Sequence, residues 1–344
     1  MRRISAIVFI AAIGAMFCGR AAAQHGQTYS NPVIDADCPD PTVIDDRERS
    51  GWFYLYSTRS GRDGRTVNLP VYRSRNLVEW EFVGDGFPQG QPSWTENAAL
   101  WAPDINYIDG HYVLYYALGV WGDLYKSASG VAVSDSPEGP FEDLGLIAGW
   151  SNLGTLNSID PNFFEDPSNG RRYLYWGSIG GGIFGMELSR DGFSVKPGAK
   201  KRLLSATNTE AAYMHRRGRY YYLFASAGSC CEGVRSSYHV IVGRSTSPLG
   251  PFKGPDGQKF NDTDYGYTVV KGTEDRKFAG PGHNAEIITD DAGQDWMLYH
   301  CYNAANGYKG RLLHLDKVLW TVDGWPYFES GHPCEISPAP VFTR

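Results

Sequence analysis

The sequence has no hydrophobic run of membrane-spanning length and no block of basic residues. Its longest apolar stretch, from Ile4 to Cys18, has fifteen residues, whereas a spanning helix needs about 20. The formal net charge is −6, and it becomes −9 without the three arginines in residues 1–23. Because nucleic-acid binding needs clustered positive charge, these features predict no nucleic-acid partner and no membrane span.

Cysteines are few, and none stands in the CxxC or Cys/His spacing of a zinc site. Five of the six lie beyond residue 23. The adjacent Cys230 and Cys231 could form a vicinal disulfide. Cys38, Cys301 and Cys334 could supply one further bridge, with one thiol left over. We therefore expect the cysteines to have structural roles.

The N-terminus has the order of a secretory signal peptide. Arg2 and Arg3 precede the apolar run, and Ala21-Ala22-Ala23 offers small residues for cleavage. This order predicts a signal peptide over residues 1–23 and a secreted or periplasmic protein. No linker or low-complexity stretch divides the remainder, so we expect one domain over residues 24–344.

One pattern recurs five times in a chain that has few helical signals and contains 41 Gly and 20 Pro. A turn residue is followed by a short aromatic and aliphatic strand, as in Trp52-Phe53-Tyr54-Leu55-Tyr56. The central leucines of the five strands are Leu55, Leu114, Leu174, Leu223 and Leu298. A period near 60 residues with several short strands per unit predicts an all-β fold, a five-bladed β-propeller. The alternative is a two-sheet sandwich with a long insertion.

A polar residue stands 10 to 15 positions before each of these leucines. The five residues are Asp40, Asp104, Asp160, Glu210 and His283. If they begin the innermost strands, they converge on one mouth of the central channel. Gathered carboxylates repel one another, so such a group points to chemistry that requires it. In hydrolysis of a glycosidic bond, one carboxylic acid protonates the leaving oxygen and one carboxylate activates water.

Several motifs resemble those of glycoside hydrolase family 43, in the order expected for that family. They include Pro39-Asp40-Pro41-Thr42, Leu100-Trp101-Ala102-Pro103-Asp104 and Asn157-Ser158-Ile159-Asp160-Pro161, then Thr209-Glu210-Ala211 and Gly280-Pro281-Gly282-His283-Asn284. The resemblance implies a five-bladed propeller that hydrolyses glycosides with inversion. It implies that Asp40 is the general base, Asp160 the pKa modulator and Glu210 the general acid. Asp104 has no catalytic role in the family and is interpreted as structural.

The same resemblance implies roles for further residues. His283 matches a histidine that holds calcium, largely through waters, and Arg311 matches an arginine that binds the terminal sugar. Trp101 is a candidate platform under the sugar, and Asn157 and Ser158 are further candidate substrate-binding residues. The alternatives are a buried blade tryptophan for Trp101 and a fold-stabilising ion pair for Arg311. We expect no organic cofactor and a monomer.

The segment around Cys230-Cys231 most resembles arabinan-directed members of the family. The expected substrate is a plant cell-wall polysaccharide or oligosaccharide with α-L-arabinofuranosyl linkages, cut in endo or exo fashion. Such arabinanases carry an aromatic pair after Gly-Ser, where this chain has Gly177-Ser178-Ile179-Gly180-Gly181. Two alternatives stay open: a β-xylosidase or α-L-arabinofuranosidase acting on xylan-derived substrates, and a non-catalytic glycan-binding propeller.

Overall fold

Five antiparallel sheets of four strands follow one another along the chain in this computed structural model, which describes residues 27–261 and 266–343. Blade 1 contains β2 (Thr42–Asp45), β3 (Phe53–Tyr56), β6 (Pro70–Ser74) and β7 (Trp80–Asp85). Blade 2 contains β8 (Ala99–Ile108), β9 (His111–Gly119), β10 (Ala128–Ser134) and β11 (Glu142–Ala148). Blade 3 contains β12 (Asn162–Glu165), β13 (Arg172–Trp176), β14 (Phe184–Glu187) and β15 (Arg202–Leu203).

Blade 4 contains β16 (Thr209–Arg217), β17 (Tyr220–Ala227), β18 (His239–Ser245) and β19 (Tyr267–Val270). Blade 5 contains β20 (Phe278–Thr289), β21 (Asp295–Asn303), β22 (Leu312–Trp320) and β23 (Pro326–Tyr327). Further elements are the hairpin β4 (Ser60–Arg62) and β5 (Arg65–Val67), the helices α1 (Arg47–Ser50) and α2 (Trp150–Leu153), and the 3-10 turns η1 (Gly233–Arg235) and η2 (Ala304–Asn306).

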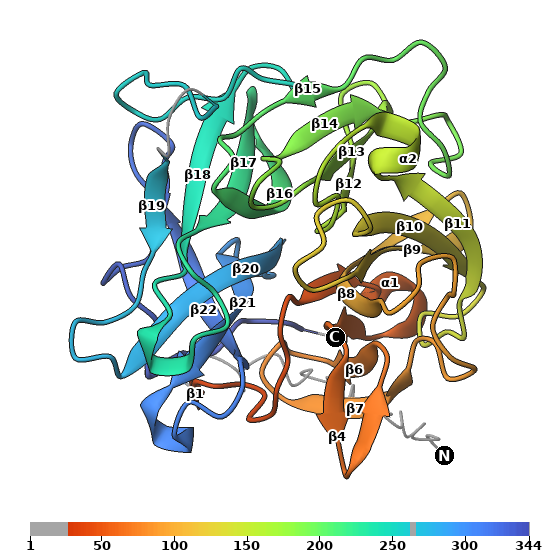
Figure 1. Ribbon diagram of the computed structural model, residues 1–344. Coiled ribbons are helices and arrows are strands. Elements are labelled where there is room, and N and C mark those ends of the chain that lie inside the picture. The colour runs from red at the N-terminus through yellow and green to blue at the C-terminus, as the bar shows by residue number, and fades with distance from the viewer. Residues whose placement is uncertain (1–26, 262–265, 344) are drawn as a thin grey trace, which may run out of the picture.

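The five sheets form a ring around a central channel (Figure 1). Each innermost strand contacts its neighbours on both sides, in the cyclic order β2, β8, β12, β16 and β20, and β20 contacts β2 again. The predicted five-bladed β-propeller is confirmed, and the two-sheet sandwich is wrong. Ring closure brings residues from all five blades to the channel.

The repeated aromatic strands of the sequence are the second strands of the blades, namely β3, β9, β13, β17 and β21. Their central leucines are at most 1% exposed, because both faces of each second strand are covered by neighbouring blades. This burial explains why those segments are apolar runs and do not alternate.

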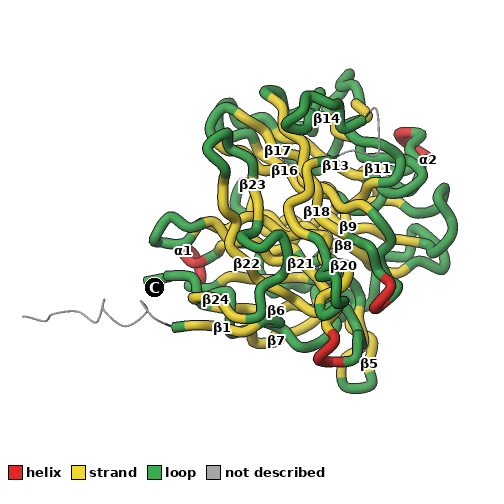
Figure 2. The backbone as a smooth tube through the Cα atoms, turned by 90° about the vertical axis from the view of Figure 1, so that its left-hand side faces the viewer, coloured by secondary structure: helices red, strands yellow, loops and turns green. Residues whose placement is uncertain are grey.

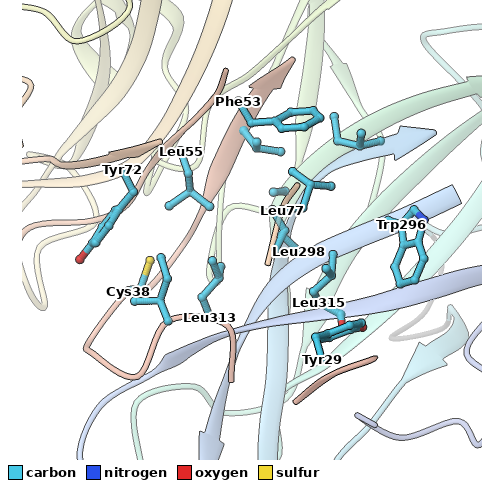
Figure 3. Close-up of a cluster of buried hydrophobic side chains, with 14 of the residues drawn as sticks. Tyr29, Cys38, Phe53, Leu55, Tyr72, Leu77, Trp296, Leu298, Leu313 and Leu315 are labelled. Atoms are coloured by element: carbon cyan, nitrogen blue, oxygen red, sulfur yellow. The ribbon is translucent and has the colours of Figure 1, made fainter. Parts of the chain in front are cut away.

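The ring is closed between blade 1 and blade 5 by the two ends of the described chain. Strand β1 (Thr28–Ser30) pairs antiparallel with β24 (Ile336–Pro338), and the two lie side by side in Figure 2. A buried cluster joins Phe53 and Leu55 of blade 1 to Trp296 and Leu298 of blade 5, and Tyr29 of β1 packs into it (Figure 3). Apolar burial therefore stabilises the junction at which the ring would open.

Two cysteine predictions have different outcomes. Cys230 and Cys231 form the vicinal disulfide. Cys38, Cys301 and Cys334 are free thiols, so the further bridge that the sequence allowed is not formed. The predicted signal peptide over residues 1–23 lies outside the described residues. Within the described part of the chain, the helices are all too short or too polar to cross a membrane.

Candidate active site

In each blade, a non-glycine residue with a left-handed backbone lies in the innermost strand or two residues before it, near the same end of the channel. These residues are Asp40 (φ 53°), Ala102 (φ 40°), Asp160 (φ 55°), Ala211 (φ 59°) and His283 (φ 44°). In β8, β16 and β20 this residue lies within a shift of the pairing register. Such irregularities interrupt the alternation of side chains along a strand and re-aim individual side chains. The blades thereby present polar groups toward one mouth of the channel.

Asp40, Asp160 and Glu210 share one electrostatic neighbourhood, and we call them the carboxylate triad. Burial raises the pKa of Asp160 to about 7; His283 opposes that rise, and the charges of Glu210 and Asp40 add to it. Burial lowers the pKa of His283, but the charges of the triad outweigh this effect and raise it. The structure therefore brings together carboxylates that lie up to 170 residues apart in sequence.

Asp40 is held as a carboxylate by two cationic partners. Its Oδ1 lies 3.1 Å from Nη1 of Arg311 and 3.1 Å from Nδ1 of His283, and the Thr58 hydroxyl donates to Oδ2 at 2.7 Å. Burial alone would raise the pKa of Asp40, but Arg311 and His283 outweigh it and hold the pKa well below its usual range. Asp40 is thus an ionised acceptor at neutral pH.

The other two carboxylates differ in exposure and in partners. Asp160 is buried and accepts a hydrogen bond at 2.8 Å from the backbone N–H of Ala211. Glu210 is half-buried and accepts one at 2.5 Å from the Ser178 hydroxyl. Glu210 is therefore the more accessible of the two, and its contact with Ser178 comes from the neighbouring blade 3.

Two aromatic residues that the sequence did not single out also line this site. Nδ1 of His300 accepts a hydrogen bond at 3.1 Å from the backbone N–H of Asp40, and burial lowers the pKa of His300 to about 4. The His300 ring stacks on Tyr238, with centroids 5.7 Å apart. A Cβ atom on Gly282 would lie 2.0 Å from the Tyr238 ring, so Gly282 leaves room for this ring beside the triad. The glycine-rich motif before His283 was the available sequence signal.

Trp101 lies in blade 2, one residue before Ala102. Its ring covers Gly119 of β9, where a Cβ atom would meet the ring at 1.7 Å, and it stands edge-on to Trp121 at 6.0 Å. The backbone N–H of the next residue, Ala102, donates to the Thr58 hydroxyl, which in turn donates to Asp40. The backbone beside Trp101 is thus linked to Asp40 through Thr58, and contact of the Trp101 ring with a sugar stays a prediction.

A search for relatives gives the assignment of the chain. Residues 29–326 match the profile described as Glycosyl hydrolases family 43. The chain belongs to this family. It is therefore a glycosidase.

The relatives of this family 43 glycosidase include the extracellular exo-α-(1→5)-L-arabinofuranosidase ArbA of Cellvibrio japonicus, 32% identical over 84% of this chain and 86% of the relative. Arabinan endo-1,5-α-L-arabinosidase A of Aspergillus niger is 34% identical over 83% of this chain and 89% of the relative. Among solved structures, the α-L-arabinanase of Cellvibrio cellulosa complexed with arabinohexaose has a TM-score of 0.75 and 29% identity, covering 86% of this chain and 96% of that chain.

Asn157 and Ser158, the other predicted substrate-binding residues of the glycosidase, have internal partners. The Asn157 side chain donates to the carbonyl of Ile179 at 3.0 Å. Ser158 is fully buried, and its hydroxyl bonds to Thr155 at 2.8 Å. Both residues hold the segment before Asp160 in place, and contact with a sugar stays a prediction for each.

Asp104 does not lie with the triad, although the sequence placed it in the same phase. In blade 2 the residue equivalent to Asp40 is Ala102, and Asp104 lies two residues further along the inner strand. Its carboxylate accepts hydrogen bonds from the Asn162 side chain at 3.0 Å and the Phe163 N–H at 2.8 Å. It also interacts with Glu286, which the sequence analysis did not identify. We call Asp104 and Glu286 the inner pair.

Proposed function

We propose that this family 43 glycosidase hydrolyses α-L-arabinofuranosyl linkages of arabinan or arabino-oligosaccharides with inversion. Asp40 is the general base, Glu210 the general acid and Asp160 the pKa modulator. The observation that carries the proposal is the different protonation of neighbouring carboxyl groups: Asp40 is held ionised, whereas Asp160 retains a proton to about pH 7. Inverting hydrolysis requires one ionised and one protonated carboxyl at neutral pH.

Asp40 supports the role of base through its surroundings. Arg311 and His283 contact Oδ1 and keep the group charged, and Thr58 donates to Oδ2 and fixes its orientation, so the ionised carboxylate is ready to accept a proton from an attacking water. The general base must be ionised before the reaction begins. A binding protein would have no need to hold neighbouring carboxyl groups in opposite protonation states.

Glu210 supports the role of acid through its position. It is half-buried and reachable by a substrate, whereas Asp160 is buried beside it and interacts with it electrostatically. The charge of Glu210 adds to the burial of Asp160, so Asp160 retains a proton to about pH 7. Asp160 thereby adds little negative charge beside Glu210 near neutral pH, and Glu210 is the carboxyl that a leaving oxygen can reach.

The names of the relatives support the choice of sugar. Both curated relatives described above act on α-1,5-linked arabinofuranosyl chains by name, one in exo and one in endo fashion. We propose export for the same reason, because the Cellvibrio relative is named extracellular and the chain begins with a signal-like segment. We propose that Arg311 contacts the bound sugar in addition to its partner Asp40.

A calcium ion near His283 remains part of the proposal in a restricted form. Calcium prefers six to eight oxygen ligands. Within residues 27–261 and 266–343, no group of three or more His, Cys, Asp or Glu side chains is arranged to hold a metal ion. The residues therefore do not fit a cage made by the protein, and a calcium here would be held by His283 and waters. The proposed hydrolysis uses no step through this ion.

Product analysis tests the proposal most directly. The purified protein is incubated with linear 1,5-α-L-arabinan, xylan and aryl pentosides, and the products are separated by chromatography. Release of arabinose or arabino-oligosaccharides is expected, and proton NMR at early times should show the β-anomer formed from the α-linkage. Products from xylan alone would favour the xylosidase alternative, no release would favour the binding propeller, and a retained configuration would remove Asp40 from the role of base.

A further inference from the structure

A groove on blade 2 is separate from the carboxylate triad and has no role in the hydrolysis described above. It has a volume of about 390 Å³, within the roughly 300–1,000 Å³ of small-molecule sites. Its lining includes Trp94, Glu96, Tyr125, Lys126, Leu146 and Trp150. We call it the outer groove.

The outer groove opens on the same face of the propeller as the triad. Strand β8 begins at Ala99 and β9 ends at Gly119, beside Trp101. Strand β10 begins at Ala128 and β11 ends at Ala148, and both residues lie at the groove end of blade 2. The inner and outer strands are three spacings apart, about 14 Å. A ligand in the groove is thus on the catalytic face, but it is not the sugar at the reacting bond.

The segment of residues 120–127 runs between the neighbourhood of Trp101 and the outer groove. Trp121, which is 79% exposed, stands against Trp101, and Tyr125 lines the groove. This segment is held from within, because the Asp123 side chain accepts the backbone N–H of Tyr125 at 3.0 Å. The carbonyl of Leu124 accepts the N–H of Asn157 at 2.6 Å, which ties the segment to blade 3. The segment therefore presents two exposed aromatic side chains, Trp121 against Trp101 and Tyr125 at the groove.

The aromatic rings of the groove are fixed in place but uncovered. Trp94 donates its indole N–H to the Tyr116 hydroxyl at 3.1 Å. Trp150 begins α2 and is 49% exposed, and the 59% exposed Tyr125 stands edge-on to it at 5.0 Å. Surfaces that are already ordered lose little entropy when they bind a ligand. Exposed apolar side chains gathered around a hollow mark an interaction site.

The composition of the groove favours a neutral, hydroxyl-rich ligand. Aromatic faces pack against the apolar faces of sugar rings, and Glu96 and Lys126 supply one hydrogen-bonding group of each charge. We propose that the outer groove binds a pentosyl unit of the polysaccharide beyond the part of the chain that occupies the active site. The inference rests on the proposed function for the identity of the sugar. It assigns to Tyr125 and Trp150 the recruitment of long substrates.

The test measures polysaccharide binding separately from hydrolysis. Tyr125→Ala and Trp150→Ala are each combined with Glu210→Gln, so that the polymer survives, and run in native gels containing linear arabinan or xylan. Each alanine substitution is expected to weaken binding of arabinan at least fivefold relative to the Glu210→Gln parent. Trp150→Tyr should restore most of the lost binding. Tyr107→Ala is the matched control, because Tyr107 is 40% exposed on the opposite face of blade 2 and should leave binding unchanged.

Steady-state kinetics of the catalytically active variants give a second test. With Glu210 intact, Tyr125→Ala should raise the KM for arabinan at least threefold relative to the KM for arabinotriose. Equal retardation of the Glu210→Gln parent and both groove variants in both polymers would contradict the proposed binding at the outer groove. Arabinan hydrolysis without groove-dependent binding contradicts only this inference, whereas groove-dependent binding without hydrolysis contradicts the proposed function. Melting temperatures exclude misfolding, and Tyr125 lies on an exposed loop where truncation is tolerated.

Discussion

The channel of this propeller contains two groups of acidic side chains that solve the same electrostatic problem in different ways. The carboxylate triad is accompanied by Arg311 and His283, which hold Asp40 ionised. The inner pair is surrounded by neutral donors instead: Glu286 accepts from the Val43 N–H at 2.7 Å. Burial raises the pKa of Asp104 to about 6 and that of Glu286 well above its usual value. Buried carboxylates thus need either a counter-charge or a proton.

This difference in environment matches the roles that we propose: catalysis for the triad and stabilisation of the fold for the inner pair. A reaction that moves protons needs neighbouring carboxyl groups in different protonation states, which the triad has. The inner pair shares a proton within a hydrogen-bond network that joins β2, β8, β12 and β20, and that network holds inner strands together. Two clusters of similar composition are therefore expected to respond to mutation in opposite ways, one in turnover and the other in stability.

The largest expected effect is on turnover. Glu210→Gln removes the carboxyl of the proposed general acid but keeps the shape, so kcat on arabino-oligosaccharides should fall at least about a hundredfold. Substrates with good leaving groups, such as nitrophenyl arabinofuranoside, should lose less, because they depend less on protonation of the leaving oxygen. Steady-state kinetics on both substrates measures the contrast.

Glu286→Gln is the matched control for that variant. It makes the same chemical change in the inner pair, and we expect its kcat to stay within about threefold of the unmodified enzyme. If Glu210→Gln kept nearly full activity on oligosaccharides, or if both variants lost turnover equally, the separation between triad and inner pair would be wrong.

The next effect is on the pH dependence of Asp40, the proposed base. The pKa of Asp40 is depressed by its cations, so the base is ionised above that low pKa and lost below it. Arg311→Met removes one cation, and the acidic limb of kcat/KM should move upward by roughly one pH unit or more. The measurement is a profile of kcat/KM from pH 3 to 8.

Arg172→Met supplies the comparison for Arg311→Met. Arg172 is also a well-buried arginine with carboxylate partners, Asp109 and Glu165, but it lies in blade 3 away from the triad. The pH profile of kcat/KM should be the same for Arg172→Met as for the unmodified enzyme. A higher KM for Arg311→Met with an unmoved acidic limb would mean that Arg311 contacts only the sugar.

The propeller and the residues of the triad could be predicted from sequence, because their signals lie in local patterns. The five leucine-centred strands are recognisable because second strands of a propeller are buried on both faces. Asp40 and Asp160 each precede a proline in the same type of segment. Ring closure then brings such segments together whatever the intervening loops contain.

The inner pair could not be predicted because it depends on register. The shift of pairing between Trp101 and Asp104 puts Ala102 at the mouth and Asp104 deeper in the channel, although the sequence suggested equivalence to Asp40. Glu286 belongs to no motif; its only signal was a charge between Ala285 and Ile287 in an apolar strand. His300 was equally hidden at the end of an aromatic run.

A smaller effect is expected on stability. Because the pKa of Asp104 is raised to about 6 in the folded state, folding retains a proton that the unfolded chain releases near pH 4. This contribution is fully present below about pH 4 and is lost as the pH rises through 6. Burial also raises the pKa of Glu286, so Glu286→Gln removes a second carboxyl whose proton favours the folded state and should flatten the decline of unfolding free energy between pH 5 and 8, by on the order of 1–2 kcal/mol.

Denaturant unfolding of both proteins across that range measures the difference. Asp160 and Asp316 also have raised pKa values near 7 and 6, so only the difference between variant and parent reports on the inner pair. Identical slopes would mean that Asp104 and Glu286 do not share a proton.

The smallest expected effect concerns a calcium ion beside His283. Such an ion would be a further difference between the triad and the inner pair. If an ion sits beside His283, EDTA should lower the melting temperature by a few degrees, because a ligand that binds only the folded state stabilises it by mass action. Calcium should restore the original value, and magnesium should do so poorly because it needs a tighter octahedral site. In His283→Asn the effect of EDTA should disappear, whereas His111→Asn, altered at an exposed histidine of blade 2, should keep it. Unchanged melting and activity of the parent protein in EDTA would leave Arg311 and His283 as the cations that compensate the triad.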